Sequence, residues 1–144
     1  TALLDLPLAN VKQSLKTAIQ ELLPTNPKAV GIRTLSNKHP NYNPNYSLND
    51  HTGGHNYHNG PEWPWLTGFF LLSLKRHGQD QYTKVYEEVL ERVKKHILLN
   101  PFAGIVELTN EGGEGCAHSC ATQAWSMACI RQAISYSSSS DRSE

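Results

Sequence analysis

Apolar residues recur every three or four positions in four parts of the chain, and this spacing predicts four helices. The pattern is clearest in the third, where Val89 and Val93 share one face with other apolar residues. Helix-breaking residues mark predicted ends, such as Pro24 after the first helix and Gly78 after the second. The four predicted helices cover residues 8–23, 61–76, 79–99 and a stretch from 119 or 122 to 134.

Two long polar connections separate these helices. The first connection, residues 25–59, is rich in asparagine, and the third connection, residues 102–120, is rich in glycine. Neither shows a regular period of apolar residues. No segment has the alternation typical of a strand, so the sequence predicts an all-α fold. In antiparallel helical hairpins, alternate connections lie at the same end. We therefore expect residues 57–65 to lie close to residues 106–114.

The composition is that of one globular domain, and it excludes several classes of function. The chain has 144 residues, 38% of them apolar, with 13 basic and 13 acidic side chains. The basic residues are scattered, which argues against nucleic-acid binding, and no apolar run is long enough to span a membrane. We expect a globular part over residues 1–134, then a serine-rich tail over residues 135–144 that has little to bury.

Three cysteines bear on the compartment and on metal binding. Cys116, Cys120 and Cys129 are an odd number without a disulfide framework, so we expect free thiols in the reducing cytoplasm. His118 lies between the first two, but a structural zinc site needs four ligands and no fourth has a suitable spacing. The glycine-rich connection lacks a phosphate-binding spacing. The sequence therefore predicts no metal and no cofactor.

Residues 55–65 combine aromatic rings, histidines, amides, a carboxylate and two prolines. The prolines restrict the backbone, aromatic rings can cover the C–H faces of a sugar, and the polar groups can bond its hydroxyls. This combination indicates a sugar-binding surface. The alternative to sugar binding is a structural role, because tryptophans more often pack in a core. Trp63 and Trp65 are two positions apart, so we expect them to face different ways.

Glycoside hydrolysis needs two carboxyl groups, one on either side of the scissile bond. The glycine-rich connection offers Glu107, Glu111 and Glu114, and Glu107 lies where ordered backbone gives way to irregular backbone. The alternative for each is a solvated loop charge. For Glu62, the residues favour a structural role at a helix N-terminus, where a negative charge interacts well with the helix macrodipole.

Three motifs, in this order, resemble the C-terminal amylo-α-1,6-glucosidase region of eukaryotic glycogen debranching enzymes. They are Asn-Tyr-His-Asn-Gly-Pro-Glu-Trp at residues 56–63, Glu-Leu-Thr-Asn at residues 107–110, and Cys-x3-Cys-x-Thr-Gln-Ala-Trp-Ser at residues 116–126. Gly-Ile-Arg-Thr-Leu at residues 31–35 is similar to another segment of that region. The resemblance extends over almost the whole chain and ends at the serine-rich tail.

The resemblance implies a fold and an activity. The fold would be an α/α toroid similar to glucoamylase, in which the four helices form two of six hairpins. The activity would be hydrolysis of the single α-1,6-linked glucose that remains at a branch stub of glycogen. The partners would be glycogen or another branched α-glucan, together with upstream domains of the same polypeptide.

The same resemblance assigns candidate site residues. Glu107 is the counterpart of the general base of an inverting enzyme, with Glu111 as the runner-up. The general acid would lie upstream of the chain, with Asp50 as the nearest candidate within it, so we expect the chain alone to be inactive. The expected substrate-binding residues are Tyr57, His58, Asn59, Glu62, Trp63, Trp65, Thr109 and Asn110. The alternative function is a noncatalytic α-glucan-binding or helical scaffold module.

Overall fold

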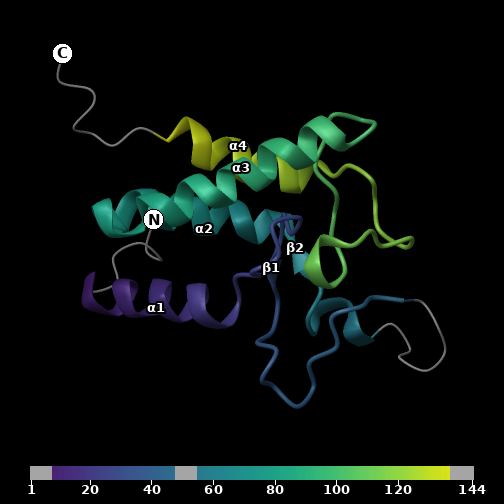
Figure 1. Cartoon of the computed structure of the whole chain (residues 1–144), viewed down its shortest axis with the longest axis horizontal. Helices are drawn as coiled ribbons and strands as arrows, with labels where there is room; N and C mark the ends of the chain where they lie inside the picture. The colour runs from purple at the N-terminus through teal and green to yellow at the C-terminus, as the bar shows by residue number, and fades with distance from the viewer. Residues whose placement is uncertain (1–7, 48–54, 137–144) are drawn as a thin grey trace.

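The computed structural model describes residues 8–47 and 55–136 and is mostly helical (Figure 1). Asp50 and the tail from residue 137 lie outside the described residues. The elements in chain order are α1 (Leu8–Glu21), β1 (Ile32–Arg33), η2 (His55–His58), β2 (Glu62–Trp63), α2 (Pro64–His77), η3 (Gln79–Tyr82), α3 (Thr83–Leu99), η4 (Glu111–Gly113) and α4 (Ala124–Ser135), where η marks a 3₁₀ helix.

The four predicted helices are confirmed, but strand pairing delays the start of the second. It was expected from residue 61, whereas α2 begins at Pro64 with Trp63 as its N-cap. The two residues before α2 form β2, which pairs antiparallel with β1 and sets Trp63 opposite Ile32. The expectation of no strand is wrong here, because a two-residue strand is too short to show an alternating pattern.

The fourth helix also begins later than the pattern predicts. Glu107 donates its N–H to the Cys120 carbonyl at 2.9 Å, and Gln123 donates its N–H to the Ile105 carbonyl at 2.8 Å. These bonds tie the residues before Ala124 to the third connection. Their backbone groups are therefore committed outside the helix, and α4 starts only after them.

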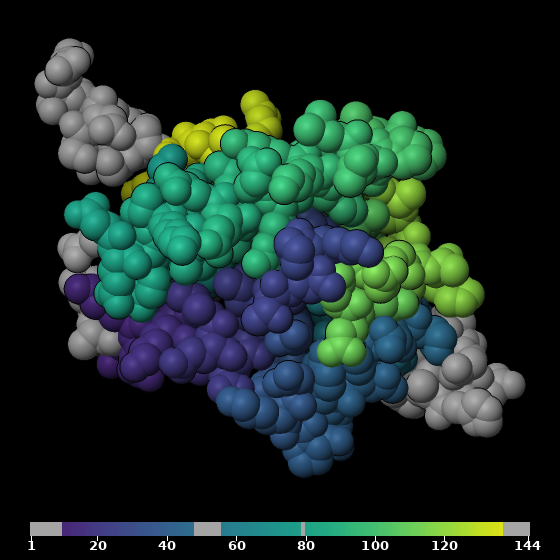
Figure 2. All heavy atoms as spheres, in the orientation of Figure 1, coloured from purple at the N-terminus to yellow at the C-terminus, as the bar shows by residue number. Residues whose placement is uncertain are grey.

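α2 is the central helix and contacts each of the other three α-helices. Its side chains Phe70 and Leu74 lie in one core with Leu15 of α1 and Val89 of α3. A second buried cluster underlies the connections and consists of Val30, Val93, Ile105 and Ile130. This second cluster anchors both long connections, which Figure 2 shows side by side, residues 25–47 in blue and residues 102–120 in light green.

One side of α2 and α4 exposes aromatic side chains. Trp65 stacks on Trp125, with ring centroids 4.4 Å apart and an interplanar angle of 13°. Phe69 meets Trp65 edge to face at 5.8 Å. Trp125 is 51% exposed and Phe69 is 48% exposed. We call Trp65, Phe69 and Trp125 the aromatic face, an apolar surface that the described part of the chain leaves open to solvent.

The close packing of α2 on α4 depends on Gly68. A Cβ atom added there would lie 2.6 Å from the Cβ of Cys129. We expect Gly68→Ala to lower the free energy of unfolding by about 1–3 kcal/mol, because the two helices would have to move apart. Urea denaturation followed by circular dichroism measures this change.

Gly115→Ala is the matched control for this substitution. A Cβ atom at Gly115 meets nothing within 4 Å, so we expect little change in the free energy of unfolding. Equal losses in the two variants would show that contact between the helices is not what requires Gly68.

Candidate functional site

The first and third connections meet at β2. Glu62 donates its N–H to the Thr109 carbonyl, and Thr109 donates its N–H to the Glu62 carbonyl, both at 2.9 Å. Nearby, the Tyr57 hydroxyl donates a hydrogen bond to Glu107 Oε1. The predicted proximity of residues 57–65 and 106–114 is therefore confirmed.

Glu107 is a half-buried carboxylate that two donors hold in place. Its Oε1 accepts a hydrogen bond from the Tyr57 hydroxyl, and its Oε2 accepts one from the N–H of Cys120 at 3.1 Å. Each carboxylate oxygen has a further lone pair, and part of the side chain is open to solvent. Glu107 can therefore accept a proton from a water molecule while its orientation stays fixed.

The ring of Tyr57 lies in a small aromatic cluster. Its centroid is 4.8 Å from that of Tyr46, 4.7 Å from that of His58 and 4.7 Å from that of Trp63. Trp63 also donates its Nε1–H to the Tyr57 carbonyl at 3.1 Å. Burial, together with the hydrogen bond to Glu107, raises the pKa of the Tyr57 phenol well above its usual value of 10.0. Tyr57 therefore remains a hydrogen-bond donor at neutral pH.

Glu62 is 0% exposed, and its carboxylate accepts three hydrogen bonds. Oε2 accepts from the Thr109 hydroxyl at 2.9 Å and from the Gly113 N–H at 3.0 Å, and Oε1 accepts from the Gly112 N–H at 2.9 Å. Burial raises the pKa of Glu62, although these donors and the charge of Arg33 act in the opposite direction. The interpretation of Glu62 as a helix N-terminal acid is wrong, because it lies in β2, before the N-cap of α2.

Besides Tyr57, three of the predicted substrate-binding residues where the connections meet are at least partly exposed. His58 is exposed, and its ring stacks on Trp63 at 5.4 Å. Asn59 is half-buried, and its backbone carbonyl accepts a hydrogen bond from the N–H of Asn43 at 2.7 Å. Asn110 is also half-buried, and its Oδ1 accepts the N–H of Tyr46 at 2.9 Å. His58 thus belongs to the aromatic cluster, and Asn110 is bonded to its member Tyr46.

The remaining predicted residues are internal or lie elsewhere. Trp63 and Thr109 are each 3% exposed. The two neighbouring tryptophans face different ways, as expected, since Trp63 contacts Tyr57 whereas Trp65 stacks on Trp125 in the aromatic face. The residues that the structure brings together where the connections meet are Tyr57, His58, Asn59, Glu62, Trp63, Glu107, Thr109 and Asn110.

The other two carboxylates of the third connection have different surroundings. Glu111 is exposed, and its Oε1 accepts a hydrogen bond from the Tyr42 hydroxyl at 3.3 Å. Glu114 forms an exposed ion pair with Lys28 at 3.4 Å. Of the three carboxylates, Glu107 is the one bonded to the aromatic cluster.

Three contributors to the site were missed by reasoning from the sequence. The first is Tyr46, which lies in a stretch where apolar residues show no regular spacing. The second is the N–H of Cys120, a backbone group whose role does not depend on residue type. The third contributor is the pair Gly112 and Gly113, whose φ angles are 71° and 80°. Adjacent glycines are a readable signal of left-handed backbone, and they could have indicated a turn that presents its amides.

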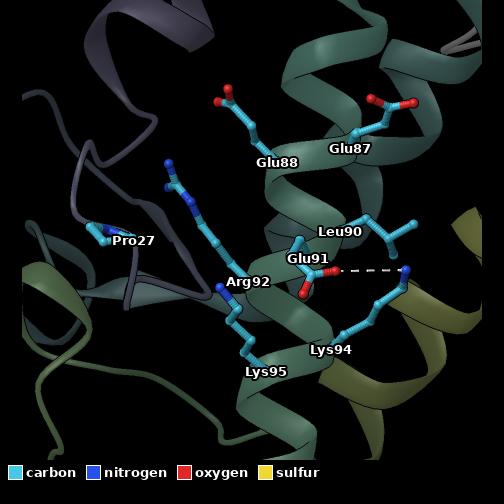
Figure 3. A pocket seen from close by; sticks show the side chains of 8 residues that line it. All are labelled: Pro27, Glu87, Glu88, Leu90, Glu91, Arg92, Lys94 and Lys95. Atoms are coloured by element: carbon cyan, nitrogen blue, oxygen red, sulfur yellow. Dashed lines mark ion pairs between the residues drawn. The ribbon is translucent and has the colours of Figure 1, made fainter.

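A hollow of about 530 Å³ lies elsewhere on the surface, between α3 and Pro27 (Figure 3). Several of its charged groups already have partners: Glu91 pairs with Lys94 at 3.8 Å, and Arg92 donates a hydrogen bond to the Pro24 carbonyl at 2.7 Å. None of the predicted site residues lines it. The candidate site is therefore the meeting point of the connections and not this hollow.

The described ranges contain neither a cluster of metal ligands nor a helix that could span a membrane. No group of three or more His, Cys, Asp or Glu side chains is arranged there to hold a metal ion. Cys116, Cys120 and Cys129 are free thiols, and burial raises the pKa of Cys129. No helix within residues 8–47 and 55–136 is both long and apolar enough to cross a membrane.

Comparison with known proteins agrees with the predicted resemblance. A family model described as amylo-alpha-1,6-glucosidase matches residues 4–132. The chain belongs to this family. It is also 36% identical over 122 residues to the glycogen debranching enzyme of Saccharomyces cerevisiae, a match that covers 70% of this chain and 8% of the yeast protein. The chain thus spans a small part of the length of that relative.

The hydrogen bond between Tyr57 and Glu107 can be tested through stability. We expect Tyr57→Phe to lower the free energy of unfolding by about 1 kcal/mol at neutral pH. The folded-state pKa of Tyr57 lies above its unfolded value of 10.0, so its contribution is complete below pH 10 and is lost as the pH rises further. Urea denaturation at about pH 8 and about pH 11 should show a smaller alkaline loss in the variant than in the unchanged chain.

Tyr42→Phe is the matched control, because the Tyr42 hydroxyl bonds the exposed Glu111 at 3.3 Å. We expect this variant to lose less stability at neutral pH. If Tyr57→Phe unfolds at the same urea concentration as the unchanged chain, its hydroxyl contributes nothing to holding Glu107.

Proposed function

We propose that this chain supplies the general base of an inverting glycoside hydrolase, which removes the α-1,6-linked glucose at a branch stub of glycogen limit dextrin. The observation that carries the proposal is the environment of Glu107, a half-buried carboxylate fixed by the Tyr57 hydroxyl and the Cys120 N–H. Membership of the amylo-alpha-1,6-glucosidase family and the yeast relative support this reaction and a branched α-glucan as the substrate.

The geometry of Glu107 fits the role of the base. An inverting enzyme sets its two carboxyl groups roughly 6.5–9.5 Å apart, with a water between the base and the sugar. Glu107 takes a proton from that water as it attacks the anomeric carbon, and an acid protonates the leaving oxygen. We propose that the acid comes from an upstream part of a longer polypeptide. Tyr57 keeps its proton throughout and holds Glu107 toward the water.

The surrounding residues have complementary roles in this proposal. The His58 side chain and the amides of Asn59 and Asn110 bond the glucose hydroxyls, because these three side chains are at least partly exposed. Trp63 and Thr109 are almost fully buried and support this wall from behind. Glu111 is exposed and remains the runner-up for the base.

We propose that the four helices form two hairpins of an α/α toroid, with residues 1–134 as its C-terminal part. The aromatic face supports this arrangement: Trp125 and Phe69 are about half exposed, and burying such apolar surface against further helices is favourable. The partners are then glycogen and upstream domains of the same polypeptide. The free thiols support a reducing compartment, the cytoplasm.

The role of Glu107 is tested in the longer polypeptide that carries this chain. We expect Glu107→Gln to reduce glucose release from α-1,6-glucosyl limit dextrin at least about a hundredfold, because the amide cannot accept the proton of the attacking water. Glycogen binding, measured by sedimentation with the polysaccharide, should be retained.

Glu88→Gln is the control for this experiment, since Glu88 is an exposed residue on α3. Unchanged glucose release by Glu107→Gln would remove Glu107 from the role of base. If the unchanged longer polypeptide binds glycogen but releases no glucose, that result would instead favour the noncatalytic α-glucan-binding module.

The proposed location of the general acid gives a second test. We expect the 144-residue chain by itself to release no measurable glucose from the limit dextrin, because a base alone leaves the departing oxygen unprotonated. Glucose release by the purified chain, and its loss on Asp50→Asn, would place the acid within the chain.

A further inference from the structure

Glu62 shares its motif with the residues expected to bind substrate, but its surroundings indicate another role. The side chain is 0% exposed. Its two oxygens accept three donors from the third connection: the hydroxyl of Thr109 and the amides of Gly112 and Gly113. A longer polypeptide would add cover to this side chain and remove none. Contact between Glu62 and a sugar would require these bonds to break.

The turn that Glu62 binds is shaped to present its amides. Gly112 and Gly113 have φ angles of 71° and 80°, and successive amides in such a conformation form a concave anion-binding site. A Cβ atom on Gly113 would lie 2.5 Å from the carbonyl carbon of Lys28, so the backbones also approach closely. The carboxylate of Glu62 fills this concave site as an internal anion.

The bonds of Glu62 continue into the segment that carries Glu107. Thr109 is bonded to Glu62 through its side chain and through both of its backbone groups. One residue earlier, the N–H of Leu108 donates to the Ser119 hydroxyl at 3.1 Å, and that hydroxyl donates to the Leu108 carbonyl at 3.0 Å. The residues after Glu107 are thus fixed on one side by Glu62 and on the other by Ser119.

We propose that Glu62 is a positioning residue for Glu107 and not a substrate ligand. By holding Thr109 and the turn at Gly112 and Gly113, it sets the backbone from which Glu107 reaches Tyr57 and the N–H of Cys120. The catalytic part of this inference rests on the proposed function of Glu107. The structural part, that Glu62 fixes Glu107, does not.

Glu62→Gln tests the inference in the longer polypeptide that carries this chain. Glutamine keeps the size of the side chain, but its amide nitrogen faces at least one of the three donors. That nitrogen is a donor itself and cannot accept the hydrogen bond. We expect kcat for glucose release to fall about tenfold or more, because a small misplacement of a catalytic group is costly, while KM changes little. A raised KM with an unchanged kcat would assign Glu62 to substrate binding and overturn the proposal.

Hydrogen exchange measured by mass spectrometry gives a readout that does not depend on activity. We expect faster exchange at Gly112 and Gly113 in Glu62→Gln, and also at Cys120, whose N–H is bonded to Glu107. Faster exchange confined to the two glycines would show that Glu62 holds the turn alone, and that result contradicts a positioning role. If Glu107→Gln retains activity, the proposed function fails, and the exchange at Cys120 still decides whether Glu62 positions Glu107.

Two further variants guard against loss of folding. Thr109→Val removes a single donor to Glu62 with little change in size. If Glu62→Gln does not fold, kcat and the exchange at Cys120 are measured in Thr109→Val instead. Glu88→Gln, on the exposed side of α3, should leave kcat and the exchange of all three amides unchanged.

Discussion

A carboxylate removed from water has to be satisfied by donors, and at Glu62 this requirement joins the two halves of the site. Its partners all belong to the third connection, while the residue itself lies in β2, just after the first. The next residue of β2, Trp63, packs edge to face against Tyr57. Thr109 forms an isolated β-bridge with Glu62 and lies two residues after Glu107. These bonds act together with the buried cluster of Val30, Val93, Ile105 and Ile130, which also anchors both connections.

The helices were predictable because each buries one stripe of apolar side chains at helical spacing. Val89 and Val93 both lie in the interior, as their spacing indicates. The ends were less predictable, since distant partners decide them. Residues 62 and 63 follow a proline and precede another, which favours a helix start, yet β1 binds them as a strand. The start of α4 likewise depends on hydrogen bonds with the third connection.

The candidate site divides in a similar way. The segment at residues 57–65 and the carboxylate Glu107 could be named from residue type and resemblance, and the meeting of the two connections followed from helical hairpin geometry. The surroundings of Glu62 could not be predicted from the sequence. A glutamate that precedes a helix and a glutamate buried against a glycine turn can have the same neighbours in sequence. What distinguishes them is a contact with Thr109, 47 positions away.

That separation also bears on the order in which the molecule folds. The helices need only neighbours in sequence to form, whereas the bonds between Glu62 and the glycine turn close a loop that includes all of α2 and α3. Closing so long a loop is entropically costly until the helices have packed and shortened the distance. The structure of the site is thus expected to arise late in folding, after its scaffold, and to be among the first features lost when that scaffold loosens.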